Sequence, residues 1–556
     1  MGKIIKFRKS LNQSFDKAND KCDEGDYLFA LSSLLNEMER HPDNADVCAH
    51  VADIYTELGL YENAILTWFK YLLRAKKEDY WEAYNGLGAN YYFLEENYLA
   101  SYYFSEQLKI TEEVCGVYAE VLEDFLDNFG EDKNQTFKLV KEKTKEEKKQ
   151  EFLDKIHKLC NEGKEDDALK ILQEIKKGDY LYGESLVEQA LIYLKNDEIV
   201  KALDYIKLSF NENCVSLLSL SLAIDLSKAL KTDEETVYLK MLEEYSAVDD
   251  EEKYKKMTAL YENGLEDSAR EIAVELLKDD RFDANTSYVL GFLLFNKGDL
   301  KGAEKCFKTA YLLSGNYTSL YYLRHVQKVI DKKENCQNIN VDFSVPKTES
   351  NRQVDLLNSL VEAESLSNEY PLSVMKDLID WCVSNKDDRA TFPTCWAFIQ
   401  SGRGDLFELV KEVLVNPTVS DVVKQSVVSV ICADTKVKSI KLVVDGVFKI
   451  ITFNRPDFSV ENKELFEKAY AKASGKVYVF KNDNKCLLSI GAKELQRELI
   501  ATGNVNAVSD VSALSCAMYV YSGLNIFKNN NFYEFFGTTK SKVVEIIKLT
   551  EIDNEN

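Results

Sequence analysis

Residues able to carry acid–base or metal chemistry are few and scattered in this 556-residue chain. Its four histidines are His41, His50, His157 and His325. None of them has a second ligand or base at the spacing that a metal site or a proton relay requires. We therefore interpret each histidine as a surface or packing residue, and the sequence predicts no metal site.

Motifs for nucleotide binding and nucleophilic catalysis are likewise missing from the sequence. The glycine cluster SGRGD at 401–405 has neither the preceding strand nor the lysine that a phosphate-binding loop needs, so we interpret it as a turn between helices. Carboxylate pairs such as Glu95-Glu96 are too common in an acidic chain to indicate catalysis. We therefore expect a protein that is not an enzyme and that holds no cofactor or small-molecule substrate.

The composition indicates which class of partner the protein binds and in which cellular compartment it lies. The net charge of −24 disfavours binding to nucleic acid or to anionic lipid. Twelve cysteines are scattered without a C-x-x-C pair, which favours reduced thiols and a cytoplasmic location. The longest apolar stretch, 507–527, is interrupted by Asp510, so it predicts a buried helix and not a membrane span. We expect a protein or peptide partner and no membrane association.

Small residues recur at a regular interval along the first 335 residues. A Gly-x4-Ala motif occurs five times, and two further alanines continue the same phase without the glycine. The alanines are Ala30, Ala64, Ala100, Ala168, Ala202, Ala269 and Ala303. Consecutive alanines lie about 34 residues apart, or about twice as far where one repeat is degenerate. This period predicts about nine antiparallel helical pairs.

The small residues have a physical role in such pairs. An alanine on the second helix, together with a small residue such as Gly88 or Gly291 on the first, lets two helix backbones approach closely. The glycine five residues before each alanine ends the first helix, in the left-handed conformation that a tight turn demands. Because one pair cannot cover its own apolar face, we expect the pairs to be stabilised by stacking.

The third and last repeats show the full pattern. The third has Tyr84, Leu87, Gly88, Tyr91, Ala100 and Phe104, and the last has Leu290, Gly291, Leu294, Ala303 and Phe307. This pattern resembles the tetratricopeptide repeat (TPR) over residues 10–335, which implies a mainly α fold with a TPR-type α-solenoid. The aromatic-rich stretch 81–110 is then one helical pair whose rings are buried against its neighbours. The excess of lysine over arginine favours an AT-rich, bacterial coding sequence.

The resemblance also implies which side chains line a concave face in the first three repeats and in the last. These are Asp16, Asn19, Asp23, Asp46, His50, Asp53, Glu57, Glu82, Asn85, Tyr288, Phe292 and Phe295. Carboxylates in the first repeats and rings in the last predict a groove for a basic peptide with aromatic anchors. The alternative interpretation is that these residues are solvated charges on an acidic protein.

The repeat pattern stops after residue 335, and the composition changes. We interpret 1–335 as the TPR-like solenoid, 336–352 as a linker, 353–435 as a HEAT-like helical segment and 436–556 as a small α+β domain. The last segment has 17 basic and 14 acidic residues, in contrast to the acidic remainder of the chain.

Two β-hairpins and a helical hairpin are predicted in that last segment. Two β-rich runs joined by Asp445-Gly446 predict a hairpin over 439–453, and a second hairpin is predicted over 476–490. The stretch 531–549 has the helix, glycine turn and capped second helix of a helix-turn-helix motif. Its exposed cations would be Lys540, Lys542 and Lys548, and its core would be Phe535, Phe536, Val543 and Ile547.

Three functions remain open at this point. The first is a protein–protein interaction scaffold that uses the concave groove. The second is a transcriptional regulator that contacts DNA through residues 531–549, although base-reading Arg, Asn and Gln are absent from the second helix of that motif. The third is an enzyme whose site lies within 436–556. We favour the scaffold.

Overall fold

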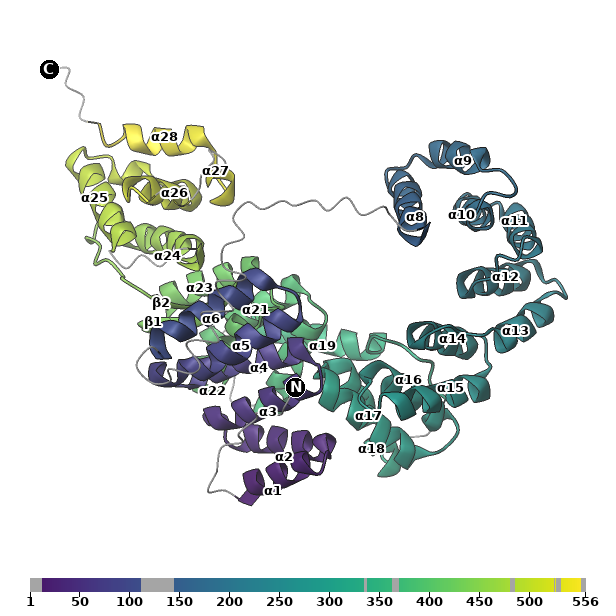
Figure 1. Cartoon of the computed structure of the whole chain (residues 1–556). Coiled ribbons are helices and arrows are strands. Elements are labelled where there is room, and N and C mark those ends of the chain that lie inside the picture. The colour runs from purple at the N-terminus through teal and green to yellow at the C-terminus, as the bar shows by residue number, and fades with distance from the viewer. Residues whose placement is uncertain are drawn as a thin grey trace. The chain divides into compact units, whose positions relative to one another are not determined.

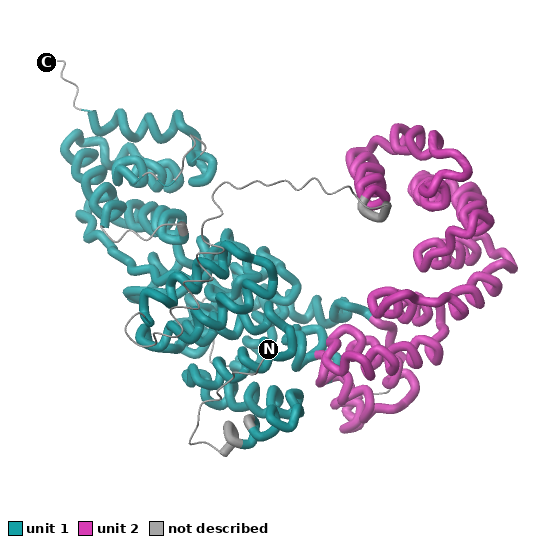
Figure 2. Tube along the Cα trace, viewed as in Figure 1, with its two compact units in different colours: residues 1–131, 311–324, 342–556 teal, residues 132–310, 325–341 magenta. Residues whose placement is uncertain are grey.

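The computed structural model describes residues 13–111, 145–334, 338–362, 370–480, 486–524, 526 and 532–551. The chain divides into two compact units, drawn in different colours in Figure 2. The first unit comprises residues 1–131, 311–324 and 342–556, and the second comprises residues 132–310 and 325–341.

The first unit opens with three antiparallel helical pairs (Figure 1). The pairs are α1 (Gln13–Asp23) with α2 (Tyr27–Arg40), α3 (Ala45–Glu57) with α4 (Tyr61–Arg74), and α5 (Tyr80–Phe93) with α6 (Asn97–Thr111). A single 3-10 turn, η1 (Lys77–Asp79), precedes α5. Asn44 and Asp26 cap the starts of α3 and α2 by accepting hydrogen bonds from backbone N–H groups in the first turn.

The second unit continues with helical pairs of the same kind. They are α8 (Lys145–Asn161) with α9 (Glu165–Glu174), α10 (Tyr182–Lys195) with α11 (Ile199–Asn211), α12 (Leu217–Leu230) with α13 (Glu235–Glu244), α14 (Asp250–Glu262) with α15 (Glu266–Asp279), and α16 (Ala284–Asn296) with α17 (Leu300–Ser314). The two units share α17 and α18 (Tyr317–Ile330). The degenerate repeat predicted between Ala202 and Ala269 is the pair α12 and α13. The one predicted between Ala100 and Ala168 lies outside the described residues.

Small residues position these pairs as predicted. All seven phased alanines are fully buried. A Cβ added at Gly88 would lie 2.6 Å from the Phe104 ring, and one added at Gly291 would lie 2.9 Å from the Phe307 ring. The helices therefore pack more closely at these glycines than any larger residue would allow. The structure confirms a chain of consecutive helical hairpins.

The turns between paired helices share one left-handed residue. Five turns use a glycine, at positions 25, 59, 163, 264 and 298, with φ between 71° and 84°. Two repeats that keep the alanine phase but lack the glycine place Glu95 (φ 62°) and Asp197 (φ 59°) at the same point, and the degenerate pair α12–α13 has Lys231 (φ 54°) in its turn. The left-handed conformation of the turn is thus present even in repeats where the residue is not glycine.

The rest of the first unit is also mainly helical. It contains α19 (Lys347–Glu362), α20 (Leu372–Ser384), α21 (Asp388–Gln400), α22 (Gly404–Val415), α23 (Asp421–Asp434), α24 (Lys463–Phe480), α25 (Leu487–Ala501), η2 (Val505–Ala507), α26 (Val511–Tyr521), α27 (Phe532–Phe535) and α28 (Lys540–Lys548). α19 begins inside the segment predicted as a linker. Gly402 (φ 67°) lies in the turn between α21 and α22, as expected for the SGRGD stretch.

One β-hairpin is present among the described residues, where Asp445-Gly446 predicted it. β1 (Ser439–Val444) pairs antiparallel with β2 (Val447–Thr452), in a register that sets Val444 opposite Val447. Asp445 (φ 48°) and Gly446 (φ 73°) both adopt positive φ, as a two-residue type I′ turn requires.

The second predicted hairpin, at 476–490, is wrong. Residues 476–480 continue α24 and residues 487–490 begin α25, so both β-rich runs are helical. Val477, Tyr478 and Val479 are fully buried in α24, and Gly475 lets that helix approach α23 so closely that a Cβ would lie 2.4 Å from the Gln425 carbonyl oxygen. Helix packing thus overrides the local β propensity.

Candidate protein-interaction surface

The acidic residues predicted to line a groove in the first three repeats differ in exposure. Asp23, Asp46 and Glu57 are exposed, whereas Asp53, Glu82 and Asn85 are half-buried. Glu82 accepts a hydrogen bond from the Tyr71 hydroxyl at 2.7 Å, so this carboxylate helps to join α4 to α5. Asp16 and Asn19 belong to α1, but their side chains lie outside the described part of the chain.

His50 is a packing residue. It is 3% exposed, and its Nδ1 lies 2.8 Å from the Asp46 carbonyl oxygen one turn earlier in α3. A partner therefore cannot reach the His50 side chain.

The aromatic residues predicted to line the groove in the last repeat are buried as well. Tyr288, Phe292 and Phe295 are at most 5% exposed. The rings of Tyr288 and Phe292 lie edge-on to Phe307, and the ring of Phe295 packs 5.6 Å from the His325 ring. These three rings form part of the interior of the second unit, and they offer no accessible aromatic surface.

An exposed aromatic surface does exist at a different place, the turn between α5 and α6. Residues 92–98, with the sequence YFLEENY, are all exposed, and we call this segment the aromatic turn. Phe93 is 51% exposed and Tyr98 is 78% exposed. The Phe93 ring stacks on Tyr61 of α4 at 4.8 Å, which fixes it to the neighbouring pair.

Corresponding turns of other repeats are polar at the position of Phe93. Counting back from the left-handed residue, that position holds Asp23, Glu57, Asn161, Lys195, Glu262 or Asn296. The aromatic turn therefore departs from a pattern that six other repeats keep. Sequence reasoning missed it because all rings of 81–110 were assigned to the interior; the signal was the unbroken run of apolar residues before Glu95.

The sequence stretches that contain and precede the aromatic turn are rich in acidic residues. There is no lysine or arginine in residues 41–69 or in residues 78–108, and these two stretches contain five and six acidic residues respectively. They cover α3, most of α4, all of α5 and most of α6. From the start of α3 to the end of α4 and from the start of α5 to the end of α6, the chain holds eight acidic residues and three basic ones, Lys70, Arg74 and Lys109, so the two helical pairs carry a net negative charge.

Two buried rings of the third repeat, those of Tyr80 and Tyr103, pack against the β-hairpin. The Tyr103 hydroxyl donates to the Gly446 carbonyl oxygen and accepts from the Phe448 N–H at 2.9 Å. The Phe448 ring lies edge-on to Tyr80 at 5.8 Å, and Val443 joins the same apolar cluster. The hairpin therefore covers this side of the α5–α6 pair, and the aromatic turn stays exposed.

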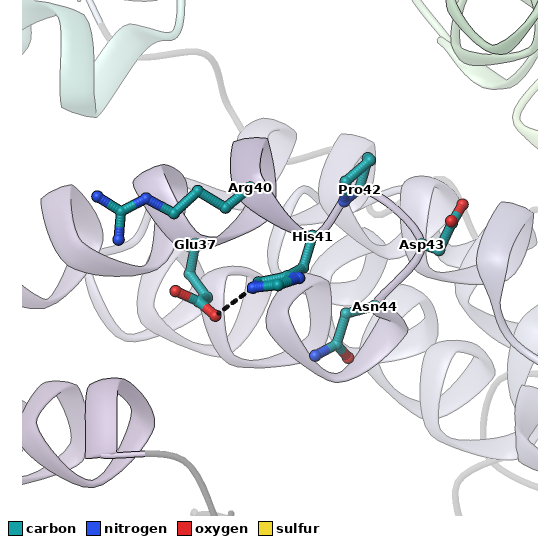
Figure 3. A pocket seen from close by; sticks show the side chains of 6 residues that line it. All are labelled: Glu37, Arg40, His41, Pro42, Asp43 and Asn44. Carbon is teal, nitrogen blue, oxygen red and sulfur yellow. Dashed lines mark ion pairs between the residues drawn. The ribbon is translucent and has the colours of Figure 1, made fainter. Parts of the chain in front are cut away.

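A shallow polar pocket lies between α2 and α3 (Figure 3). Its lining side chains are Glu37, Arg40, His41, Pro42, Asp43 and Asn44. His41 Nε2 lies 3.5 Å from Glu37 Oε1, and Figure 3 shows the imidazole turned toward that carboxylate. The six lining residues include no Ser, Thr, Cys or Lys that the imidazole could activate as a nucleophile.

The helix-turn-helix stretch forms a small helical hairpin. α27 is a single turn of four residues, and Phe536 and Val543 are buried between it and the neighbouring helices. Lys540, Lys542 and Lys548 are all exposed, and Lys542 also forms an ion pair with Asp510 at 2.9 Å. The second helix thus presents three exposed lysines, one of which is paired with a carboxylate.

No family model matches the chain, and none of the curated proteins matches it. Within the described ranges, no group of three or more His, Cys, Asp or Glu side chains is arranged to hold a metal ion. The helices of the described residues include none that is long and apolar enough to cross a membrane.

Proposed function

We propose that this chain is a non-enzymatic interaction scaffold that binds a basic protein segment at the aromatic turn. The observation that carries the proposal is the exposure of Tyr92, Phe93, Leu94 and Tyr98 at a turn whose counterparts in other repeats are polar. Aromatic side chains are enriched among the residues that dominate binding energy at protein interfaces. A partner that covers this turn removes a large apolar area from water.

The surrounding charge sets the chemistry of the partner. Eleven acidic residues and no lysine or arginine lie in residues 41–69 and 78–108, so a basic segment is attracted and an acidic one is repelled. We therefore propose a partner with Lys or Arg on either side of one apolar or aromatic anchor. The anchor packs on Phe93 and Tyr98, and the cations face carboxylates such as Glu57 and Glu62.

The repeat type is part of the same proposal. We assign the helical pairs to the TPR class because the buried alanines and the left-handed turn residues recur at the TPR period. A cytoplasmic location, expected from the scattered cysteines, belongs to the proposal too.

The test is a selection of peptides of random sequence on the full-length protein. We expect enriched peptides to combine two or more Lys or Arg residues with one aromatic or aliphatic residue. The double variant Phe93→Ser/Tyr98→Ser should weaken binding of an enriched peptide at least tenfold in fluorescence anisotropy, because it removes the apolar anchor site.

A matched control is available on α11 of the second unit. Val200 and Leu208 are 60% and 46% exposed, so Val200→Ser/Leu208→Ser also removes two exposed apolar side chains, but away from the aromatic turn. This control should bind the peptide like the unchanged protein. Enrichment of acidic peptides, or equal loss of binding in both double variants, would show that the aromatic turn is not the binding surface.

A further inference from the structure

A short segment of the chain is bound across two helices of the second unit. Asn296, the last residue of α16, donates from Nδ2 to the Ile339 carbonyl oxygen at 3.0 Å and accepts at Oδ1 from the Ile339 N–H at 3.0 Å. The Tyr261 hydroxyl of α14 accepts from the Val341 N–H at 2.7 Å. Two first helices of neighbouring repeats therefore bind the backbone of residues 339–341.

Side chains of this segment alternate in exposure. Ile339 and Val341 are half-buried, and Val341 packs against the apolar core of the second unit. Asn338, Asn340 and Asp342 are exposed. Alternation with a period of two is the pattern of an extended chain that lies on a surface.

The hydrogen bonds from Asn296 and Tyr261 recognise the backbone of residues 339–341 and depend little on the residue type. A side-chain amide that bonds both the N–H and the carbonyl of one residue accepts any residue except proline there, as strand addition to a sheet edge does. Selectivity then comes from the places that Ile339 and Val341 occupy, two residues apart. The site thus fits an extended peptide with the pattern aliphatic-x-aliphatic.

We propose that the surface formed by Asn296 and Tyr261 is a binding site for an extended peptide, which residues 338–341 occupy as a tethered ligand. A partner with two aliphatic residues at the same spacing exchanges with them. A segment held by a few hydrogen bonds and two half-buried side chains belongs to the least stable part of a fold, so it opens before the helices do. This site is independent of the aromatic turn.

Tethering predicts how strongly a free peptide competes. A segment joined to its site by a short linker acts at an effective concentration in the millimolar range. A free peptide of the same sequence therefore binds the unchanged protein weakly, and it binds well only when residues 338–341 have been displaced from the site.

The experiment uses a fluorescent peptide of residues 337–343, QNINVDF, and the full-length chain. In the variant Ile339→Asp/Val341→Asp the tethered segment loses both aliphatic contacts. The control Asn338→Asp/Asn340→Asp adds the same charge at the same spacing on exposed positions. We expect the first variant to bind the peptide at least tenfold more tightly than either the control or the unchanged protein, and the added change Asn296→Ala to remove that gain.

Equal peptide affinity of the two double variants would overturn the proposal, as would a gain that Asn296→Ala leaves intact. A second measurement needs no variant, in case the first one does not fold. Hydrogen exchange of the unchanged protein is followed with and without millimolar unlabelled QNINVDF. We expect faster exchange over residues 338–342 when the peptide is present, and unchanged exchange at saturating peptide would contradict a site that exchanges its occupant.

Discussion

At the residue scale, the repeats tolerate residues other than glycine at the left-handed position of their turns. Glycine reaches positive φ without steric cost, whereas a residue with a Cβ pays about 1–2 kcal/mol in the left-handed conformation. Glu95 and Asp197 adopt φ values of 62° and 59° in the turns that lack glycine. The chain therefore retains local strain at these two positions, one of which lies within the aromatic turn.

Glycine at position 95 should relieve that strain. We expect Glu95→Gly to raise the free energy of unfolding by up to about 1 kcal/mol, because the gain at positive φ exceeds the entropy that glycine adds to the unfolded chain. Asp197→Gly should gain less, since aspartate tolerates the left-handed region better than glutamate. Urea unfolding followed by tryptophan fluorescence measures Glu95→Gly through Trp68 and Trp81, and hydrogen exchange measures Asp197→Gly in α10 and α11. A destabilising effect of Glu95→Gly would show that the turn is not strained.

At the scale of elements, the C-terminal end of α4 is bound to α22 and to β1 of the first unit. Arg74 of α4 forms an ion pair with Glu412 of α22, and Lys70 lies 3.9 Å from the same carboxylate. Lys441 of β1 donates to the carbonyl oxygens of Leu72 and Leu73 at 2.7 and 2.9 Å, which satisfies groups that the end of α4 leaves open. Charged groups therefore bind this helix at its C-terminal turn.

Asp380 of α20 belongs to the same charged cluster. Burial raises the pKa of its carboxyl to about 6, even though Lys376 and Lys70 favour the ionised form. This pKa lies above the ordinary value of an aspartate. Between about pH 4 and pH 6, the Asp380 carboxyl is therefore protonated in the folded state but ionised in the unfolded state. The contribution of Asp380 to stability is therefore full below that window and falls as the pH rises through it.

Asp380→Asn should remove this pH dependence. We expect the free energy of unfolding of the unchanged protein, relative to the variant, to fall by up to about 3 kcal/mol between pH 4 and pH 7. Urea unfolding of both proteins at matched pH values measures the difference. A difference that stays constant over this range would mean that Asp380 titrates normally in the folded chain.

Local signals predicted some elements and not others. The helical pairs and the first hairpin could be predicted, because the small residues and Asp445-Gly446 fix backbone geometry through near neighbours in sequence. α24 could not be predicted at 476–480, since its buried face is defined by α23, which is distant in sequence. The burial of Tyr103 by the hairpin is likewise a contact across more than 340 residues.

At the scale of the whole molecule, the repeat period predicts which helix faces recur, but it does not predict which side chains on those faces stay exposed. A repeat period gives the phase of each helix, and that phase correctly indicated acidic surface at Asp23, Asp46 and Glu57. It could not show that Tyr288, Phe292 and Phe295 are covered by later elements of the second unit. It also could not show that Phe93 and Tyr98 remain uncovered, because exposure depends on which distant segments pack nearby.

The most direct measurement of the proposed function places a photo-cross-linking amino acid at position 98 in the full-length protein, within its native cell. We predict a cross-linked partner at this position, suppressed by an excess of the selected basic peptide, and no such product when the same amino acid replaces Val200. Identical products at positions 98 and 200, or a product at 98 that the peptide does not reduce, would contradict binding at the aromatic turn.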